Sequence, residues 1–506
     1  MSAIMAARSM KHSILFAHFV VLLLQYSDAL KLRNPMPSFT CSANTSGISD
    51  FYRQATAHNP PTDKVTLHNY ELMYGIFLAP LRQAIAPPKM LEIGLGCDMA
   101  YGPGASVKLW KTFMPSIKLW EAEFNERCVE RGKQRGLLDG IDVVTGDQAN
   151  PSVVERWAKE TGGNFDIVID DGGHKSKQIH TSFNVLWKHV AAGGLYFIED
   201  LQVSRTPKFN DPDVTSMIDV IEDWVEQLMI PEGKGHQRPV DYSLPEKASF
   251  LFCQSEAVVL GKAPDVEGKS SSCSASTKGI AEFRSMAKQL SPTTHKVTRH
   301  EYQLMYGIFL SPLRHARASP KMLEIGLGCD MVYGPGASVK LWKEFLPRVN
   351  LWEAEFDEQC VERSVQNGLL DGVQVVTGDQ GEAADVQRWV TETGGNFDVV
   401  VDDGGHHSKH FLTSFQVLWP HVVPGGLYMI ENLEASRTLN FVDTGVPSMA
   451  DVIEDWIEQL VIRKGEDVEG GERRAVENLL PTGVSFIFCQ AEACVIGKDA
   501  QSPAKM

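Results

Sequence analysis

Apolar runs of strand length alternate with amphipathic stretches through the first half of the chain. The runs expected to form strands are Met90–Gly94, Ile117–Glu123, Ile141–Thr145, Phe165–Asp170, Gly194–Ile198, Ser249–Cys253 and Ala257–Leu260. The stretches expected to form helices are Ala105–Phe113, Glu126–Leu138, Pro151–Thr161, Lys177–Val190 and Val214–Met229. This order predicts a mostly parallel α/β sheet covered on both faces, and the short gap between the last two runs predicts an antiparallel hairpin.

The same pattern occurs again in the second half of the chain. Pro320–Lys343 repeats Pro88–Lys111 with one difference, Val332 in place of Ala100. Each copy is long enough to bury its own core, which indicates two tandem whole domains rather than an array of small repeats. We expect each domain to contain a seven-stranded, mostly parallel sheet with an antiparallel last strand. The expected boundaries are 41–262 and 279–498 for the domains and 263–278 for a Ser-rich linker.

Charge and composition narrow the class of partner. The 506 residues carry a formal net charge of −16 and contain no run of Lys or Arg, so the average field repels a polyanion. Nucleic acid is therefore not an expected partner, and a neutral or cationic small molecule or glycan is. The 43% hydrophobic and 22% charged residues are ordinary for a soluble globular protein.

The N-terminal segment has the order of a secretory signal. Arg8 and Lys11 precede the apolar run Ile14–Leu24, which is short for a membrane span, and small residues follow near Ser27. We expect a signal peptide at residues 1–29, with an uncleaved signal anchor or the first part of a bipartite plastid address as alternatives. The expected location is the secretory pathway, either secreted or in the lumen of the ER or Golgi.

Cysteine positions leave two interpretations open. Eight of the nine cysteines occupy equivalent places in the two copies, and Cys494 is the exception. In an oxidising lumen the four cysteines of one copy allow three disulfide connectivities. Duplication of four buried thiols explains the pattern equally well. The Cys and His spacings do not indicate a zinc site.

A glycine loop follows the first expected strand of each copy. Glu92 precedes Gly94 and Gly96, and glycines let the backbone turn tightly and approach a ligand closely. The dinucleotide fingerprint requires a third glycine at the position of Met99. The loop therefore favours S-adenosylmethionine over a dinucleotide. The equivalent residues of the second copy are Glu324, Gly326 and Gly328.

Polar residues at the ends of the next two strands extend this candidate cofactor site. Glu123 ends the second expected strand, where a carboxylate accepts hydrogen bonds from ribose hydroxyls. Asp147 and Gln148 follow the third, in a position to contact adenine. An exposed strand end is the alternative role for Glu123. The equivalent residues of the second copy are Glu355, Asp379 and Gln380.

Acidic residues also gather at the ends of the fourth and fifth expected strands. Asp171, Glu199 and Asp200 offer oxygen ligands suited to Mg²⁺, and a bound cation lowers the pKa of a substrate hydroxyl. His174 then serves as general base near neutral pH. Helix capping by these acids is the alternative, although clustered carboxylates repel one another without a cation. The second copy has Asp403, Glu431 and His406, with Asn432 in place of Asp200.

Taken together, these motifs resemble a known enzyme family. The ordered set MLEIGLG, GPGASVKLWK, LWEAEF, TGDQ, FDIVIDDGGH and GGLYFIEDL is similar to the macrocin/mycinamicin-type family of metal-dependent sugar O-methyltransferases, and also to hard-surface-induced proteins of eukaryotic microbes. The resemblance covers most of each copy. It implies two tandem class I methyltransferase domains of Rossmann-like fold, with Asp171, Glu199 and Asp200 as Mg²⁺ ligands and His174 as base.

The resemblance also implies a helix before the first strand that covers the cofactor. Its polar side chains would be His68, Tyr70 and Tyr74, with packing as their alternative role. The expected function is S-adenosylmethionine-dependent, Mg²⁺-assisted O-methyl transfer to a hydroxyl of a sugar, glycan or glycosylated small molecule. A tandem protein that binds cofactor or glycan without turnover is the alternative. Loss of the Asp200 carboxylate predicts weaker cation binding by the second copy.

Overall fold

The computed structural model describes residues 45–264, 277–316, 318–462 and 474–500. The expected signal segment, the cysteines Cys41 and Cys273, and most of the expected linker lie outside the described residues. Among the described residues, no helix is both long enough and apolar enough to cross a membrane.

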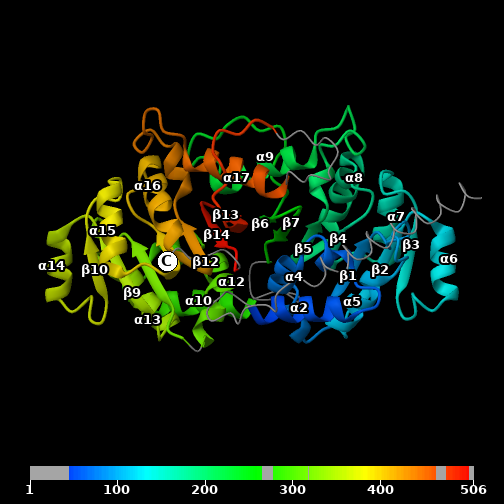
Figure 1. The fold of residues 1–506 in the computed structure, drawn as a ribbon, viewed down its shortest axis with the longest axis horizontal. Helices are drawn as coiled ribbons and strands as arrows, with labels where there is room; N and C mark the ends of the chain where they lie inside the picture. The colour runs from blue at the N-terminus through cyan, green and yellow to red at the C-terminus, as the bar shows by residue number, and fades with distance from the viewer. Residues whose placement is uncertain (1–44, 265–276, 317, 463–473, 501–506) are drawn as a thin grey trace, which may run out of the picture. The chain divides into compact units, whose positions relative to one another are not determined.

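The first repeat begins with helices and continues as alternating strands and helices (Figure 1). Its helices are α2 Thr45–Ala57, α3 Asp63–Thr66, α4 Glu71–Phe77, η1 Pro80–Gln83, α5 Ala105–Phe113, α6 Glu126–Gln134, α7 Pro151–Thr161, α8 Ser176–Leu186, η2 Trp187–His189, η3 Leu201–Val203 and α9 Met217–Met229. Its strands are β1 Lys89–Ile93, β2 Lys118–Glu123, β3 Asp142–Thr145, β4 Phe165–Asp170, β5 Val190–Ile198, β6 Ala248–Gln254 and β7 Ala257–Lys262.

The second repeat has the same order of elements. Its helices are α10 Thr277–Gln289, α11 His295–Thr298, α12 Gln303–Phe309, η4 Ser311–His315, α13 Ala337–Phe345, α14 Glu358–Gln366, α15 Ala383–Thr393, α16 Ser408–Leu418, η5 Trp419–His421, η6 Leu433–Arg437 and α17 Met449–Val461. Its strands are β8 Lys321–Ile325, β9 Asn350–Glu355, β10 Gln374–Thr377, β11 Phe397–Asp402, β12 Val422–Ile430, β13 Val484–Gln490 and β14 Ala493–Lys498.

Local sequence signals set most of these boundaries. The expected bounds of β4, α5 and α7 agree with the structure. The helix expected to reach Leu138 instead ends at Gln134, because the chain reverses at Gly136 with a φ of +69°. Val190 was expected at the end of a helix and is the first residue of β5, since the chain leaves α8 through a short 3₁₀ turn.

All the strands join one 14-stranded mixed sheet. Its order is β10-β9-β8-β11-β12-β14-β13-β6-β7-β5-β4-β1-β2-β3, so both repeats show the order 3-2-1-4-5-7-6 with the last strand antiparallel to its neighbours. A large Rossmann-like α/β sheet was predicted and is confirmed. In Figure 1 the two halves meet at β6 and β13.

The junction between the halves was not predicted. Strands β6 and β13 pair in antiparallel orientation, and Phe250 stacks on Phe488 with ring centroids 5.1 Å apart. Helices α9 and α17 pack against each other over this junction. Arg205 of the first repeat reaches the buried Glu458 at 3.0 Å, and Arg437 reaches the buried Glu226 at 2.8 Å. Each half therefore supplies a cation that neutralises a buried acid of the other.

Two apolar cores lie on opposite faces of the sheet and both continue through the two repeats. One contains Trp157 and Trp224 from α7 and α9, and the other contains Trp110 and Phe113 from α5. The strands carry apolar side chains on both faces, as expected for a mostly parallel sheet under two helical layers. This double cover leaves the carboxyl ends of the parallel strands as the place where polar groups gather.

Three disulfides resolve part of the cysteine question. Cys97 pairs with Cys128, and the equivalent Cys329 pairs with Cys360, so one connectivity is duplicated. Each bond ties the glycine loop after the first strand of its repeat to the helix after the second. Cys489 pairs with Cys494 across the last hairpin of the second repeat, whereas Cys253 is a buried thiol.

Candidate functional site

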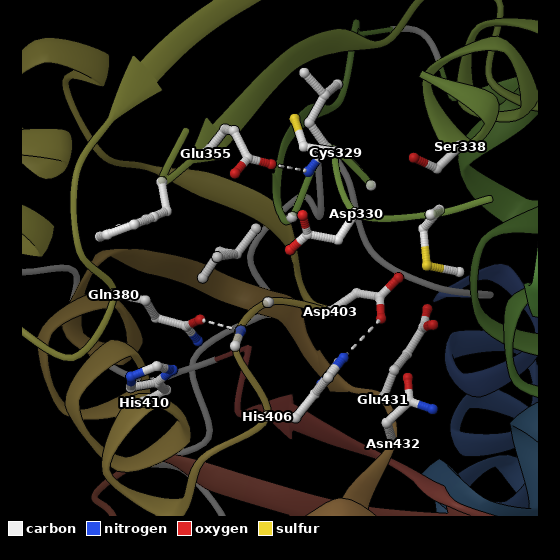
Figure 2. A pocket seen from close by; sticks show the side chains of 18 of the residues that line it. Cys329, Asp330, Ser338, Glu355, Gln380, Asp403, His406, His410, Glu431 and Asn432 are labelled. Carbon is white, nitrogen blue, oxygen red and sulfur yellow. Dashed lines mark hydrogen bonds and ion pairs between the residues drawn. The ribbon is translucent and has the colours of Figure 1, made fainter. Parts of the chain in front are cut away.

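A cavity of about 1310 Å³ lies at the carboxyl ends of the parallel strands in the second repeat (Figure 2). Open α/β sheets bind ligands at this edge. Most of the predicted site residues of this repeat line the cavity: Gly326, Gly328, Glu355, Asp379, Gln380, Asp403, His406 and Glu431. Asn432, which occupies the position of Asp200, lines it too. Residues predicted from the sequence to form one site therefore surround one cavity in the fold.

The two glycines of each loop have different structural roles. A Cβ on Gly94 would lie 2.0 Å from the carbonyl oxygen of Asp171, so this glycine permits the loop to pack against the end of β4. Gly96 has a φ of +75°, and a Cβ there would meet the Met99 side chain at 3.5 Å and the Gly102 carbonyl oxygen at 3.9 Å, both ordinary contact distances. Since Gly328 behaves in the same way and lines the cavity, the second glycine leaves room for a ligand.

Glu123 is buried at the end of β2 and holds the glycine loop in place. Its carboxylate accepts hydrogen bonds from the backbone N–H of Leu95 at 3.1 Å and of Asn125 at 2.8 Å. Glu355 repeats this arrangement with Leu327 and Asp357, each at 3.0 Å. The carboxylate retains free acceptor positions on the cavity side, which fits the predicted contact with ribose hydroxyls.

The predicted adenine contacts after the third strand differ in availability. Asp379 lines the cavity and accepts a hydrogen bond from the Gly381 N–H at 2.7 Å. The amide of Gln148 is engaged by the protein itself, because its Nε2 donates to Asp170 at 2.7 Å and its Oε1 accepts from Gly173 at 3.1 Å. Gln148 therefore fixes the loop that carries the acid cluster, and Gln380 does the same in the second repeat.

Glu92 and Glu324 do not occupy the predicted position beside the cofactor. Glu324 is fully buried and is not among the residues that line the cavity. Glu92 accepts a hydrogen bond from the Trp110 indole at 2.9 Å and lies 3.4 Å from the ammonium of Lys64. The acid before the glycines therefore belongs to a buried ion cluster, which is a correction to the sequence prediction.

Lys64 is the centre of that cluster and was missed in the sequence analysis. Its buried ammonium lies 2.6 Å from Asp171 and 2.8 Å from both oxygens of Glu199, in addition to Glu92. Lys296 holds the equivalent acids of the second repeat. The carboxylates raise the pKa of Lys64 well above its ordinary value, although burial acts to lower it. The retained Lys-Val-Thr triplet before the first strand was the available signal.

The internal ammonium changes the predicted metal site. Glu199 accepts hydrogen bonds from Lys64 on both oxygens and from the Tyr74 hydroxyl on Oε1. Asp171, His174 and Asp200 instead form a group whose ligand atoms lie within 4.8 Å of one another. Glu199 stays a predicted ligand, since its counterpart Glu431 lines the cavity, but a buried lysine already supplies it with a counter-charge.

The geometry of the Asp171, His174 and Asp200 group suits a cation. The Nε2 of His174 lies 3.5 Å from the Oδ2 of Asp200 and 4.0 Å from the Oδ1 of Asp171. Lys64 and the hydroxyl of Tyr70 take the other two carboxylate oxygens, at 2.6 Å and 2.7 Å. Two carboxylate oxygens thus face one imidazole nitrogen, each held by a second contact from behind.

The pKa values of the two aspartates are shifted in opposite directions. Burial raises the pKa of Asp171 to about 6, against the opposing effect of Lys64. Burial also acts to raise the pKa of Asp200, but the nearby His174 and His68 hold it below its usual value. His174 and Asp200 both have left-handed backbone, with φ of 55° and 57°. Such strained residues persist where the surrounding structure fixes them, which is common at functional sites.

The tyrosines before the first strand do not cover the cofactor. Tyr70 and Tyr74 are fully buried, and each donates its hydroxyl to an acid of the cluster, Asp200 and Glu199 respectively. Their equivalents Tyr302 and Tyr306 do not line the cavity of the second repeat, although His300 does. The correction is physical: a phenol buried behind the acids orients them instead of contacting ligand.

The second repeat keeps the lysine but loses the cation group. The side chains of Asp403 and His406 approach to 4.0 Å, as in the first repeat (Figure 2). Asn432 adds no charge, and among the described residues no metal-type group forms around His406. Burial lowers the pKa of His406, and its Nδ1 has no hydrogen-bond partner among the described residues.

Comparison with known proteins finds similarity to several O-methyltransferases. A demethylmacrocin O-methyltransferase from Streptomyces fradiae is 35% identical over 156 residues, which is 29% of this chain and 38% of the relative. A mycinamicin VI 2''-O-methyltransferase from Micromonospora griseorubida is 37% identical over 115 residues, 22% of this chain and 27% of the relative. The predicted resemblance to macrocin/mycinamicin-type O-methyltransferases is confirmed, whereas the resemblance to hard-surface-induced proteins stays a prediction. No family model matches the chain.

The extent of these matches limits their use. The chain spans between 27% and 50% of the length of the curated relatives it matches. Among solved structures, the MycE methyltransferase of the mycinamycin pathway, determined with Mg, SAH and mycinamycin VI, aligns with a TM-score of 0.32 at 24% identity. This alignment covers 45% of this chain and 56% of that one.

Proposed function

We propose that this protein is an S-adenosylmethionine-dependent O-methyltransferase that methylates a sugar hydroxyl with the help of a divalent cation. The observation that carries the proposal is the group of Asp171, His174 and Asp200 at the same sheet edge as the glycine loop. Its curated relatives are O-methyltransferases of glycosylated natural products, which supports a hydroxyl of a sugar or glycan as substrate.

The residues present fit the cofactor. Gly96 leaves space at the loop, and Glu123 is fixed by two backbone donors with acceptor positions to spare. We assign Glu123 to the ribose hydroxyls and Asp147 to the adenine edge. The cofactor supplies the methyl group as a sulfonium, and its transfer to a hydroxyl oxygen releases one proton.

The residues also fit a hard cation. Asp171 and Asp200 would hold it through the oxygens that face His174, and it would supply positive charge that lowers the pKa of the substrate hydroxyl. With the cation held by the two aspartates alone, His174 would keep Nε2 free to accept the proton of a hydroxyl bound beside them. Lys64 opposes the rise in pKa that burial gives Asp171 and Glu199, and it orients both acids.

We further propose that the two repeats are tandem methyltransferase domains of seven strands each, and that the protein resides in the secretory pathway. Disulfides persist in oxidising compartments, and the duplicated bonds Cys97–Cys128 and Cys329–Cys360 support that location. Fusion of the intact protein to a redox-insensitive fluorescent protein, imaged with lumenal markers, tests the location directly.

Asn432 gives a second candidate function to the second repeat. Without the carboxylate of Asp200 its cavity lacks the proposed Mg²⁺ position, so this repeat would bind cofactor or glycan without turnover. This is a division of labour within one chain, with catalysis assigned to the first repeat.

Calorimetry on the full-length protein tests cofactor binding by both repeats. We expect two S-adenosylmethionine molecules per chain, and loss of one of them in Gly96→Val and in Gly328→Val. A preference for NAD, or no binding of either, overturns the proposal. Methyl transfer to a panel of free and glycosidic sugars should stop when the divalent cation is chelated. Undiminished turnover in chelator would remove the metal from the mechanism and leave the transferase assignment standing.

A further inference from the structure

In the 3₁₀ turn after the fifth strand, the positions of an acidic residue and an amide residue are swapped between the two repeats. The first repeat has Asp200 and Gln202, and the second has Asn432 and Glu434 at the same positions. Both turns therefore keep one carboxylate and one amide, but the carboxylate moves by two residues. The charge is kept while its position changes.

The moved carboxylate builds a different group in the second repeat. His300, Glu434 and Glu492 offer ligand atoms that all lie within 4.8 Å of one another. They come from three places in the fold: the segment before α12, the turn η6, and the hairpin between β13 and β14. His300 and Glu434 line the cavity described above.

An unsatisfied buried oxygen points to a ligand at this group. Glu434 is 9% exposed, and its Oε2 is buried without a hydrogen-bond donor among the described residues. Its other oxygen accepts a long hydrogen bond of 3.4 Å from the Asn432 amide. A buried carboxylate oxygen without a donor is costly, so a cation or a ligand donor is expected beside Oε2.

The first repeat has the equivalent histidine and glutamate, but it lacks the acid that corresponds to Glu434. His68 contacts Glu256 at 2.7 Å, as His300 contacts Glu492 at 2.6 Å, but Gln202 stands where the second repeat has Glu434. The second carboxylate beside His68 is Asp200, at 3.6 Å, and it also belongs to the group with Asp171 and His174. In the second repeat both carboxylates of the group, Glu434 and Glu492, lie outside the Asp403–His406 pair.

We propose that the second repeat binds a divalent transition-metal ion at His300, Glu434 and Glu492, displaced from the position that Asp171, His174 and Asp200 provide in the first repeat. Two carboxylates and one imidazole suit Mn²⁺ or Zn²⁺ better than Mg²⁺, which prefers oxygen ligands alone. The inference goes beyond the proposed function, because it requires neither cofactor nor methyl transfer.

Lys234 of the first repeat competes for this position. Its ammonium lies 3.1 Å from the Oε1 of Glu492, and its side chain is 43% exposed. A partly exposed lysine can leave at little cost, so a metal ion would displace it. The first repeat thus regulates the affinity of a site in the second.

Titration of the full-length, cofactor-free protein with Mn²⁺, with free Mn²⁺ measured by EPR, tests the proposal. We expect two bound ions per chain in the wild type, one in Glu434→Gln, one in Asp200→Asn, and none in the double variant. Glu434→Gln introduces the residue that the first repeat already accommodates, so folding should be unaffected. Glu392→Gln on the exposed face of α15 is the matched control and should keep both ions.

Two further measurements identify the ligands. Pulsed EPR of the Asp200→Asn protein should show nitrogen coupling to the remaining Mn²⁺, and His300→Gln should abolish it. Lys234→Gln should tighten that ion by about twofold to fivefold, the range expected for one partly exposed ion pair.

The outcomes separate this inference from the proposed function. Two ions retained in Glu434→Gln, or one wild-type ion that Asp200→Asn abolishes, overturns the site at Glu434. A third outcome is that the wild type binds one ion, which Asp200→Asn retains and Glu434→Gln loses. That result supports the site at Glu434 and removes the metal from the proposed mechanism of the first repeat. Absence of bound Mn²⁺ overturns both.

Discussion

The two repeats share their framework and differ at the points where a ligand would bind. Lys64 and Lys296 make the same contacts with two buried glutamates and one partly exposed aspartate, and Tyr74 and Tyr306 donate to the same glutamate position. By contrast, the turn after the fifth strand carries Asp200 in one repeat and Asn432 in the other. Duplication has preserved what folds the site and altered what binds in it.

The framework explains why such a change is tolerated. Asp200 and Asn432 both have left-handed backbone, with φ of 57° and 55°, a conformation that Asp and Asn adopt more readily than most residues. Exchange of one for the other therefore alters charge without altering the path of the chain. Cation preference can diverge between the repeats at little cost in stability.

Removal of the candidate base should produce the largest difference between the repeats. His174→Ala should lower the rate of methyl transfer by about 10²–10⁴-fold, the range for loss of a general base. His406→Ala should have little effect, because its repeat lacks the Asp200 carboxylate. Single-turnover assays of the full-length variants with saturating cofactor measure both. Equal losses in the two variants would show that both repeats catalyse the reaction.

Loss of the buried lysine should affect both repeats alike. Lys64→Met and Lys296→Met each leave buried carboxylates without their counter-charge, and removal of one partner of such a cluster costs about 3–5 kcal/mol. Urea unfolding of each variant gives the free energy of unfolding. Lys111→Met, which removes an exposed contact with the Asp139 carbonyl, is the control and should cost much less. A loss below about 1 kcal/mol in either repeat would show that the acids are neutral when the lysine is absent.

Sequence reasoning succeeded where a signal is local. The expected strand and helix boundaries at β4, α5 and α7 follow from apolar runs and from caps such as Asn150 and Pro151. The cavity-lining positions Glu355 and Asp379 were predicted because the ends of parallel strands meet at one edge.

Long-range contacts were missed for the same reason. Lys64 reaches acids more than a hundred positions away, and its triplet looks like any amphipathic segment. Pairing of β6 with β13 depends on two hairpin edges that only the folded halves bring together. The lysine beside Glu199 was missed because the sequence shows an acid but not which cation neutralises it.

Two buried glutamates at the contact between the halves, Glu222 of the first repeat and Glu454 of the second, should change the stability of the protein with pH in the same direction. Burial raises the pKa of Glu222 to about 7 and of Glu454 to about 8, although Arg474 and Arg238 oppose it. Folding therefore favours the protonated carboxyls over the unfolded chain, whose glutamates titrate near 4.5. The stability that they contribute is present below about pH 4.5 and is lost as the pH rises toward 8.

Glutamine variants isolate this effect. The stability advantage of the wild type over Glu222→Gln and over Glu454→Gln should fall between pH 5 and pH 8.5, since the amides do not titrate. Thermal unfolding at a series of pH values measures it, with the exposed Glu477→Gln as the control that should show no trend. An advantage that grows with pH would mean that the arginines, and not burial, decide the ionisation of these acids.

The smallest expected difference lies in the last hairpin of each repeat. Cys489 pairs with Cys494 in the second repeat, whereas Cys253 faces Val258 in the first. Cys494→Val gives the second hairpin a Cys–Val pair, as Cys253 and Val258 form in the first hairpin. Because the disulfide closes a short loop between strands that are hydrogen-bonded anyway, its loss should cost about 2 kcal/mol or less. Urea unfolding with and without reductant measures this cost, with Val258→Cys as the reciprocal variant that should gain a similar amount. A larger loss in Cys494→Val would show that the second hairpin depends on its cross-link for packing, and the two hairpins would then not be interchangeable.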